Sequence, residues 1–391
     1  MPDPAGPILA GLRVVEISAF IAAPLGGACL ASLGADVIRV DPPGGGIDID
    51  RWPVHRGRSL YWAGLNQGKR SVTLDLRSGR GRQQATGLIT APGEGGGIFL
   101  TNLGGAGWSS YETLSAIRSD LIMVVISGSR DSGTAVDYTV NAGRGFPFVT
   151  GPSDAAGPIN HVLPAWDALT GFLAATAILA ADRHRRATGE WQLVRLSLAD
   201  VATAVAGNLG LIAEAELVDE PRGRFGNYVF GSFGRDFETR DARHVMVLAL
   251  TPRQWKSLGE ATALTERLQE LAATEHANFD AEADRWRCRE AIGELIEAWV
   301  RARDYGAVTE AFDRAGVLWG PYRTFKEFAS GEDLRASPRS FVDRVTHPGI
   351  GPYTTVASPL AFGANANVPP RPSPTLGQHT DEVLREFGLD A

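Results

Sequence analysis

One carboxylate, Asp167, stands at the head of a strongly apolar run, residues 172–181, that predicts a helix. Aspartate is a favoured helix N-cap because its oxygen accepts hydrogen bonds from the free amides of the first turn, and the residue type alone favours this use. The same amides would also hold the carboxylate ionised and fixed in direction, the state that a carboxylate nucleophile needs. The segment therefore predicts either a structural cap or a covalent catalyst.

Two basic positions suit a ligand that carries phosphates. Arg39 stands at the end of an expected strand, and Lys69 directly precedes another. Cationic side chains at strand ends near helix N-termini commonly hold phosphates. Each residue by itself is explained more simply as a solvated surface charge.

Two turns could bring backbone close to a ligand. The first, residues 18–24, carries Ile21 and Ala22 but no G-x-G-x-x-G fingerprint, which disfavours NAD. Its small residues suit either a bound phosphate or tight helix packing. The second turn, which includes Asn102 and Leu103, follows an expected strand and could equally be only a turn.

The order of expected elements predicts an α/β fold. Apolar or alternating runs indicate strands at residues 12–17, 36–40, 71–76, 97–102, 121–127 and 192–196. Expected helices separate several of them, at residues 24–33 and from Asp167 onward. Strands joined through helices form a parallel sheet with helices on both faces, and such sheets bind ligands beyond the carboxyl ends of their strands.

Three regions are expected along the 391 residues. Residues 1–220 form a large Rossmann-like domain, residues 221–330 a smaller α+β domain, and residues 331–391 a loop-rich segment that ends in a short helix and returns to the first domain. The smaller domain opens with glycines alternating with aromatics, residues 226–235. This stretch suits either a mobile loop that shields an intermediate and donates to an oxyanion or an aromatic contact.

Composition excludes several classes of protein. A net charge of −7 argues against a nucleic-acid partner. No apolar run is expected to span a membrane, and the first residues lack the basic start of a signal peptide. The seven histidines show no pair at ligand spacing, and Cys29 and Cys288 are far apart, so we expect no metal and a reducing cytoplasmic location.

Taken in order, six segments resemble the class III CoA-transferases, the family of formyl-CoA and carnitine CoA-transferases and α-methylacyl-CoA racemases. The segments are LAGLRVVE (residues 9–16), LGADVIRV (33–40), KRSVTLDL (69–76), the Asp167 segment (160–171), AGVLWGP (315–321) and LGQHTDEVL (376–384). The resemblance covers nearly the full length, and six matches in the family's order are far more specific than one.

The resemblance implies a catalytic role for Asp167 and a homodimer of two subunits interlinked like rings. It implies that CoA enters as part of an acyl-CoA substrate, with no permanently bound cofactor. Two departures stand out: a family CoA-binding arginine is replaced by Ser110 or a neighbour, and the glycine loop is not a poly-glycine run. The residues that the resemblance places along the CoA site are Ile21, Ala22, Arg39, Lys69, Asn102 and Leu103.

A missing residue favours transferase over racemase chemistry. Racemisation needs an acid/base group on each face of the α-carbon, and the racemases supply a histidine shortly before their aspartate. No histidine occurs here between Ser129 and Thr150. Asp167 acting with a tyrosine is not excluded for α-carbon deprotonation but is poorly matched at neutral pH.

Several idiosyncratic stretches, among them RWPV (residues 51–54), DYTVN (137–141) and GRDFET (234–239), resemble one branch of the family. That branch moves CoA between the two carboxyl groups of an unsaturated dicarboxylic acid, mesaconate. The alternatives are a transferase that uses a separate acid, a racemase and an idle CoA-binding protein. Candidate cations for the distal carboxylate are Arg51, Arg56, Arg130 and Arg235. Tyr138, Asn141 and His161 are candidates to orient the diacid, and Asn227 and Gly231 belong to the glycine loop.

Overall fold

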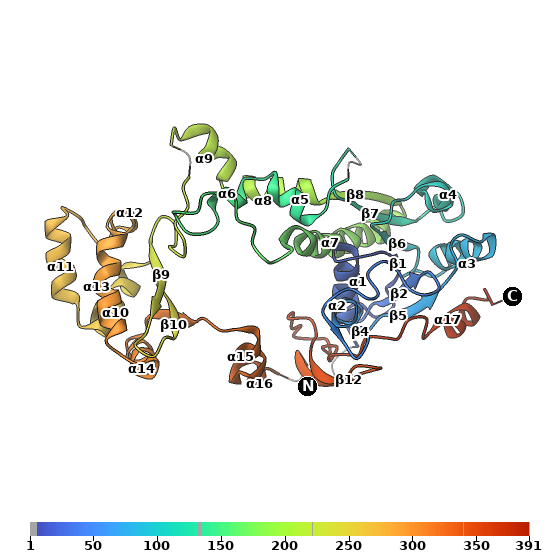
Figure 1. The fold of residues 1–391 in the computed structure, drawn as a ribbon. Coiled ribbons are helices and arrows are strands. Elements are labelled where there is room, and N and C mark those ends of the chain that lie inside the picture. The colour runs from blue at the N-terminus through green and yellow to red at the C-terminus, as the bar shows by residue number, and fades with distance from the viewer. Residues whose placement is uncertain (1–5, 132–133, 221, 339, 391) are drawn as a thin grey trace. The chain divides into compact units, whose positions relative to one another are not determined.

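In the computed structural model, which describes residues 6–131, 134–220, 222–338 and 340–390, six parallel strands form one sheet in the order β5-β2-β1-β6-β7-β8 (Figure 1). The expected α/β class is confirmed. The strands are β1 (Arg13–Ile17), β2 (Asp36–Asp41), β5 (Arg70–Thr73), β6 (Ile98–Thr101), β7 (Ile122–Ser127) and β8 (Gln192–Ser197). The strand expected at residues 71–76 is therefore shorter than its alternating pattern indicated.

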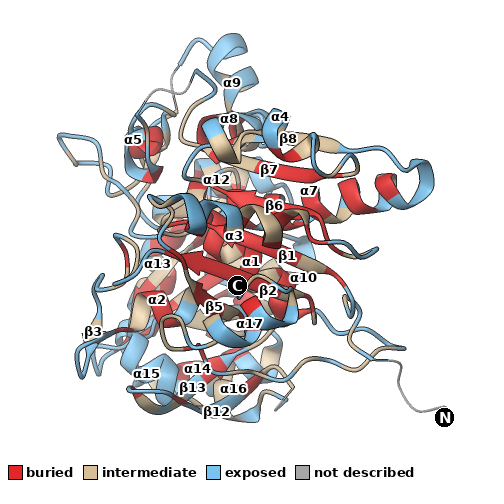
Figure 2. Cartoon of the chain, turned by 90° about the vertical axis from the view of Figure 1, so that its right-hand side faces the viewer, coloured by how far each residue is buried: buried red, intermediate tan, exposed pale blue. Residues whose placement is uncertain are grey.

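Alternation along β1 assigns its side chains to two helical layers. Val15 and Ile17 pack into a buried apolar cluster to which Leu88 of α3 (Gly79–Thr90) and Val383 of α17 (Thr380–Glu386) also belong. Glu16 points to the opposite face, where α1 (Ala22–Ser32) and α7 (Ala165–Thr188) lie. The inner strands β1, β2 and β6 are almost wholly buried, whereas the edge strand β8 is mostly half-buried (Figure 2).

Small residues bring α1 and α7 into close contact on that face. A Cβ atom on Gly171 would lie 2.7 Å from the backbone oxygen of Ala22, and one on Gly26 would lie 3.0 Å from the backbone oxygen of Gly171. Real Cβ atoms essentially never approach backbone to 2.7 Å, so Gly171 is required for this packing, and a Cβ on Gly26 would be tighter than nine in ten real contacts. The contact fixes the first turn of α1 beside the second turn of α7.

We expect Gly171→Ala to destabilise the protein by roughly 1–3 kcal/mol, because the added methyl must push α1 away from α7. Gly207→Ala in α8 (Leu198–Asn208) is the matched control, since its Cβ would meet only Ile212 at 3.8 Å. The control should be neutral or slightly stabilising. Thermal unfolding of both variants measures the difference, and equal melting temperatures would contradict the close-packing argument.

Helix α7 is longer and more apolar than the sequence argument allowed. We expected no run of membrane-spanning length, but residues Ala165–Thr188 form one helix that is long and apolar enough to qualify. In this structure α7 packs against α1, α8, β7 and β8. Core helices of soluble proteins pass the same test, so the helix carries no conclusion about a membrane.

The chain divides into two units. Unit 1 comprises Met1–Arg144, Val162–Leu217 and Gly331–Ala391; unit 2 comprises Gly145–His161 and Val218–Ser330. The division near residue 220 lies where the sequence suggested a linker, whereas residues 145–161, which we had assigned to the first domain, group with unit 2. Within unit 1, α17 is attached to β5, because the Thr73 amide donates to Thr380 Oγ1 at 3.0 Å.

Unit 1 also contains shorter elements. The segment after residue 330, expected to be mostly loop, forms a hairpin of two strands, β12 and β13. The bounds are β3 (Val54–His55), β4 (Arg58–Ser59), α2 (Leu60–Leu65), η1 (Gly107–Ser109), α4 (Tyr111–Ser115), α5 (Asp137–Ala142), α9 (Leu211–Leu217), α16 (Glu332–Ala336), β12 (Val342–His347) and β13 (Gly351–Val356).

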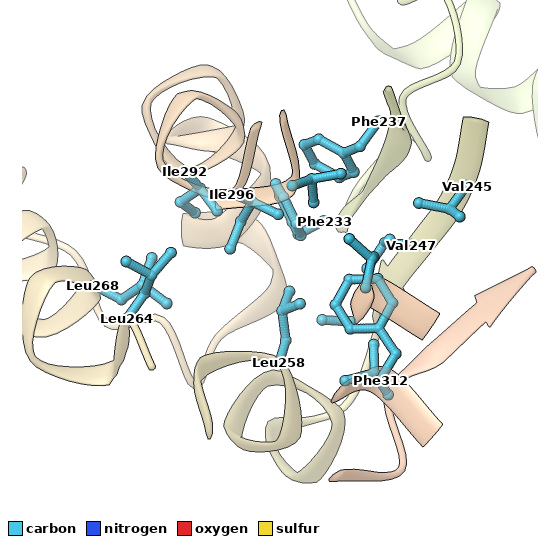
Figure 3. Close-up of a cluster of buried hydrophobic side chains, with 14 of the residues drawn as sticks. Phe233, Phe237, Val245, Val247, Leu258, Leu264, Leu268, Ile292, Ile296 and Phe312 are labelled. Carbon is cyan, nitrogen blue, oxygen red and sulfur yellow. The ribbon is translucent and has the colours of Figure 1, made fainter. Parts of the chain in front are cut away.

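Unit 2 has its own sheet and its own core. Strands β9 (Phe233–Glu238), β10 (His244–Ala249) and β11 (Leu318–Pro321) pair antiparallel in the order β11-β10-β9. Figure 3 shows the buried cluster that joins Phe233 and Val247 of the sheet to Ile292 and Phe312 of the helices. The helices are α6 (Phe146–Val149), α10 (Pro252–Thr262), α11 (Thr265–Thr274), α12 (Glu282–Arg287), α13 (Arg289–Arg301), α14 (Tyr305–Ala315) and α15 (Phe325–Ser330).

Candidate functional site

Asp167 does not cap its own helix. Helix α7 begins at Ala165 after Pro164, and Asp167 is the third residue of the first turn. The cap is supplied by Asp137 of α5, whose Oδ2 accepts from the Trp166 amide at 2.7 Å and from the Asp167 amide at 3.0 Å. The interpretation of Asp167 as an N-cap is therefore wrong for this structure, and its side chain is left for another use.

Asp137 is built into the structure as a buried anion. It is 2% exposed, and its Oδ1 has no hydrogen-bond partner in the described part of the chain. One turn further along α5, Asn141 Oδ1 accepts from the Trp166 indole at 3.2 Å. Helix α5 thus holds the first turn of α7 at two points. The sequence reasoning missed this role of Asp137, although a second aspartate 30 residues before the first was a visible signal.

The environment raises the pKa of Asp167 to about 6. Burial contributes most, the neighbouring negative charge of Asp137 adds to the rise, and the positive charge of Arg51 opposes it. We had expected the first-turn amides to hold Asp167 ionised, but those amides are occupied by Asp137. At neutral pH most of the Asp167 population is still ionised, and a poorly solvated carboxylate is a stronger nucleophile than one held by many donors.

Because the pKa of Asp167 rises from 3.8 to about 6 on folding, its ionisation destabilises the folded state at neutral pH. We expect Asp167→Asn to stabilise the protein by up to about 3 kcal/mol above pH 7. The gain should shrink as the pH falls through 6 and vanish near pH 4, where the wild-type carboxyl is protonated in the folded state. Thermal unfolding at pH 4.5 and 7.5 measures it; a capping aspartate would give no gain at either pH.

We also expect Asp137→Asn to lower the pKa of Asp167, because it removes the negative charge and keeps one oxygen for the amides. In the wild type, the rate of a reaction that needs ionised Asp167 should fall as the pH drops below about 6. In the variant this fall, the acid limb of the pH–rate profile, would move to lower pH. Asp219→Asn, at an exposed position, is the matched control and should leave the limb in place. An unshifted limb in Asp137→Asn would show that Asp137 does not set the charge of Asp167.

Arg51 brings a cation to the same site. Its guanidinium carbon lies 5.4 Å from the centre of the Phe20 ring and 5.2 Å from that of Tyr61. Burial raises the pKa of Tyr61 to about 12, with Arg51 lowering it and the Asp167 charge adding to the rise. The phenol therefore stays protonated and can donate a hydrogen bond throughout the physiological range. Sequence reasoning proposed Arg51 but missed both aromatic rings.

The turn after β1 is held in an unusual conformation beside this site. Asn102 accepts from the Ala19 amide at 2.9 Å and donates to the Ala19 carbonyl at 2.7 Å. Phe20 has φ +63°, a left-handed conformation that bulky residues rarely adopt, and its amide donates to Asp48 Oδ2 at 2.9 Å. Ile21 follows as the N-cap residue of α1, and Ala22 is buried in its first turn.

Arg39 and Lys69, the expected phosphate ligands, are 1% and 3% exposed. Arg39 donates to both oxygens of Asp41 at 2.9 and 3.0 Å and lies 3.5 Å from Asp48. Lys69 Nζ donates to Glu16 at 2.9 Å and to the Pro24 carbonyl at 2.8 Å, and burial lowers its pKa to about 8. Both cations are buried and donate to backbone carbonyls on either side of the turn, Arg39 to Ser18 and Lys69 to Pro24. Because both are already paired with carboxylates, their contact with a CoA phosphate stays a prediction.

A cavity of about 540 Å³ opens beyond the carboxyl ends of β1, β2, β5 and β6. Ser18 and Ala19 of the turn line it, as do Leu103 and the exposed Arg77, a cation that the sequence reasoning missed. Parallel sheets bind ligands at this edge. The cavity and the Phe20–Arg51 pair therefore share the turn at residues 18–21.

The remaining expected site residues are distributed over both units. In unit 1, Tyr138 donates from its hydroxyl to the Val162 carbonyl at 3.2 Å, and Asn141 is fully buried against Trp166. Arg130 is exposed and lies 3.2 Å from Asp200. The others are Arg56 and Ser110 in unit 1 and His161, Asn227, Gly231 and Arg235 in unit 2, where Arg235 lies 3.3 Å from Glu297. Within the described residues, no cluster of histidine, cysteine and carboxylate side chains could hold a metal ion.

The sequence model of CoA-transferase family III matches residues 9–380. The chain is 52% identical to 2-methylfumaryl-CoA isomerase of Chloroflexus aurantiacus over 97% of this chain and 93% of that protein. It is 28% identical to succinyl-CoA:mesaconate CoA-transferase of Haloarcula marismortui over 97% and 96% of the two chains. A CAIB/BAIF family protein from Brucella suis has a similar fold, with a TM-score of 0.79 and 23% identity over 98% of this chain and 100% of that one.

Proposed function

The chain belongs to CoA-transferase family III, and we propose that it moves CoA between the two carboxyl groups of one unsaturated dicarboxylic acid, converting mesaconyl-C1-CoA into mesaconyl-C4-CoA. The observation that carries this proposal is Asp167, a half-buried carboxylate released from helix capping by Asp137. The extensive sequence identity of the whole chain to an isomerase of 2-methylfumaryl-CoA supports the choice of substrate.

In the proposed mechanism, a carboxylate oxygen of Asp167 attacks the thioester carbonyl carbon. The C–S bond breaks, which gives a mixed anhydride and the CoA thiolate. The thiolate then attacks the aspartyl carbonyl, and breaking of its C–O bond releases the free diacid and leaves an aspartyl-CoA thioester. The other carboxylate of the diacid repeats the two steps in reverse order, so that Asp167 is regenerated and CoA ends on the other carboxyl group. No net proton is taken up.

In this proposal, CoA occupies the cavity beyond the strand ends, with its nucleotide portion on the turn at residues 18–19 and its phosphates toward Arg77, because these residues line the cavity. Binding energy from this remote part of the substrate can be used to position the thioester against Asp167. CoA acts here as part of the substrate, and the proposal requires no permanently bound cofactor. We also propose the homodimer and the cytoplasmic location that the family resemblance and the two free cysteines suggest.

A conventional transferase with a separate acid acceptor is the second candidate, because the 28%-identical relative is named as one. The two functions differ in their need for an acceptor. An isomerase converts mesaconyl-C1-CoA with no other acid present, whereas the conventional enzyme depends strictly on an added carboxylic acid.

We expect purified protein to convert mesaconyl-C1-CoA to the C4 isomer without any added acid, as followed by liquid chromatography. Asp167→Asn should reduce the rate by at least about 10³-fold, because an amide cannot form the anhydride. Asp219→Asn serves as the matched control and should keep the wild-type rate. Conversion only after an acid such as succinate is added would instead assign the intermolecular reaction.

A further inference from the structure

The side chain of Arg51 contacts two aromatic rings and is not paired with a carboxylate among the described residues. Its guanidinium carbon lies 5.4 Å from the centre of the Phe20 ring and 5.2 Å from that of the Tyr61 ring. The backbone is fixed as well, because Ser59 Oγ donates to the Arg51 carbonyl at 2.5 Å. Contacts with two rings limit the movement of a guanidinium and so favour one position for its N–H donors.

Arg51 also has no carboxylate within ion-pair distance among the described residues, although it is near enough to Asp167 to lower that carboxyl's pKa. Among the described residues Arg56 has no ion pair either, but its charge is not among those that shift the pKa of Asp167. The two remaining expected cations are paired. Arg130 lies 3.2 Å from Asp200, and Arg235, in unit 2, lies 3.3 Å from Glu297. A planar cation with no carboxylate partner, next to the proposed nucleophile, is an arrangement suited to a second carboxylate, since the two can pair through two parallel hydrogen bonds.

We propose that Arg51, held by Phe20 and Tyr61, binds the distal carboxylate of the substrate and so restricts the enzyme to dicarboxylic acids. This inference rests on the proposed function and deepens it. Tyr61 contributes a phenolic donor that stays protonated. Arg51 is exposed in this structure, so it can receive a carboxylate from solvent. A monocarboxylic acyl group would lack the paired hydrogen bonds to the guanidinium and would therefore be bound less well.

The same contact explains how one molecule can be both donor and acceptor. After CoA has moved to Asp167, the diacid is free and carries a carboxylate at each end. Arg51 can hold either end while the other faces the aspartyl thioester. Exchange of the two ends on one cation then produces isomerisation without an external acid, and retention by Arg51 slows escape of the diacid.

Two thioesters that differ only in the distal carboxylate test the proposal: mesaconyl-C1-CoA and methacrylyl-CoA. Exchange of isotopically labelled CoA into each thioester reports the Asp167 chemistry without requiring isomerisation. Assays at pH 8 keep Asp167 ionised, so that any change in its pKa on loss of Arg51 does not affect the rate. We expect the wild type to prefer the mesaconyl thioester, and Arg51→Gln to lose roughly 10²-fold in kcat/KM for that substrate and little for methacrylyl-CoA.

Arg51→Lys is the second variant, because it keeps the charge and removes the planar fork; it should recover only part of the loss. Arg183→Gln is the matched control. It removes an exposed guanidinium from α7 at a point 16 residues from Asp167, about 24 Å along the helix axis. The control should behave as wild type with both thioesters.

An equal loss with both thioesters in Arg51→Gln would overturn the proposal and assign Arg51 to the nucleophile or to CoA binding. No loss with either would also overturn it. Failure of the proposed function looks different: the wild type would then exchange neither thioester, or would exchange both without isomerising the mesaconyl one.

Discussion

The site depends on the pairing of one carboxylate with two backbone amides. Every α-helix presents unpaired amides in its first turn, and the side chain of the N-cap residue or water normally accepts from them. Here Asp137, supplied by α5, accepts from the amides of Trp166 and Asp167. This frees the Asp167 side chain, and it also places a second negative charge close enough to raise the pKa of Asp167. The position of Asp167, the proposed nucleophile, and part of its raised pKa thus follow from one cap.

The strands of the main sheet could be predicted because their signals are local. Residues 12–17, 36–40 and 121–127 are apolar runs bounded by turn residues, and each became a strand with nearly those bounds. The end of β5 could not be predicted in this way. Alternation continues through Leu76, but pairing with β2 stops at Thr73 opposite Asp41, and a neighbouring strand rather than the sequence pattern decides where a strand ends.

At the site, too, sequence patterns predict local features but not contacts between distant side chains. Asp167 and Arg51 could be named from residue type and resemblance, since each lies in a distinctive segment. The cap from Asp137 and the two rings that contact Arg51 could not, because they join residues that are 10 to 31 positions apart and depend on how the backbone turns between them. Arg39 and Lys69 show the converse. Their charges suggested a ligand, but the fold turns both toward Glu16 beneath the turn.

The connection between β2 and α2 carries Arg51. The contacts that hold this connection in place do not involve Asp167. Asp48 attaches it to Arg39 and to the Phe20 amide, and Ser59 attaches it at the start of α2. Asp167 is positioned from elsewhere, by α5 and by the contact between α1 and α7. If Arg51 and Asp167 have the roles proposed above, mutations in this connection change which acid is recognised and preserve the covalent chemistry. Such a separation gives natural selection a route from one acyl-CoA substrate to another without passing through an inactive ancestor.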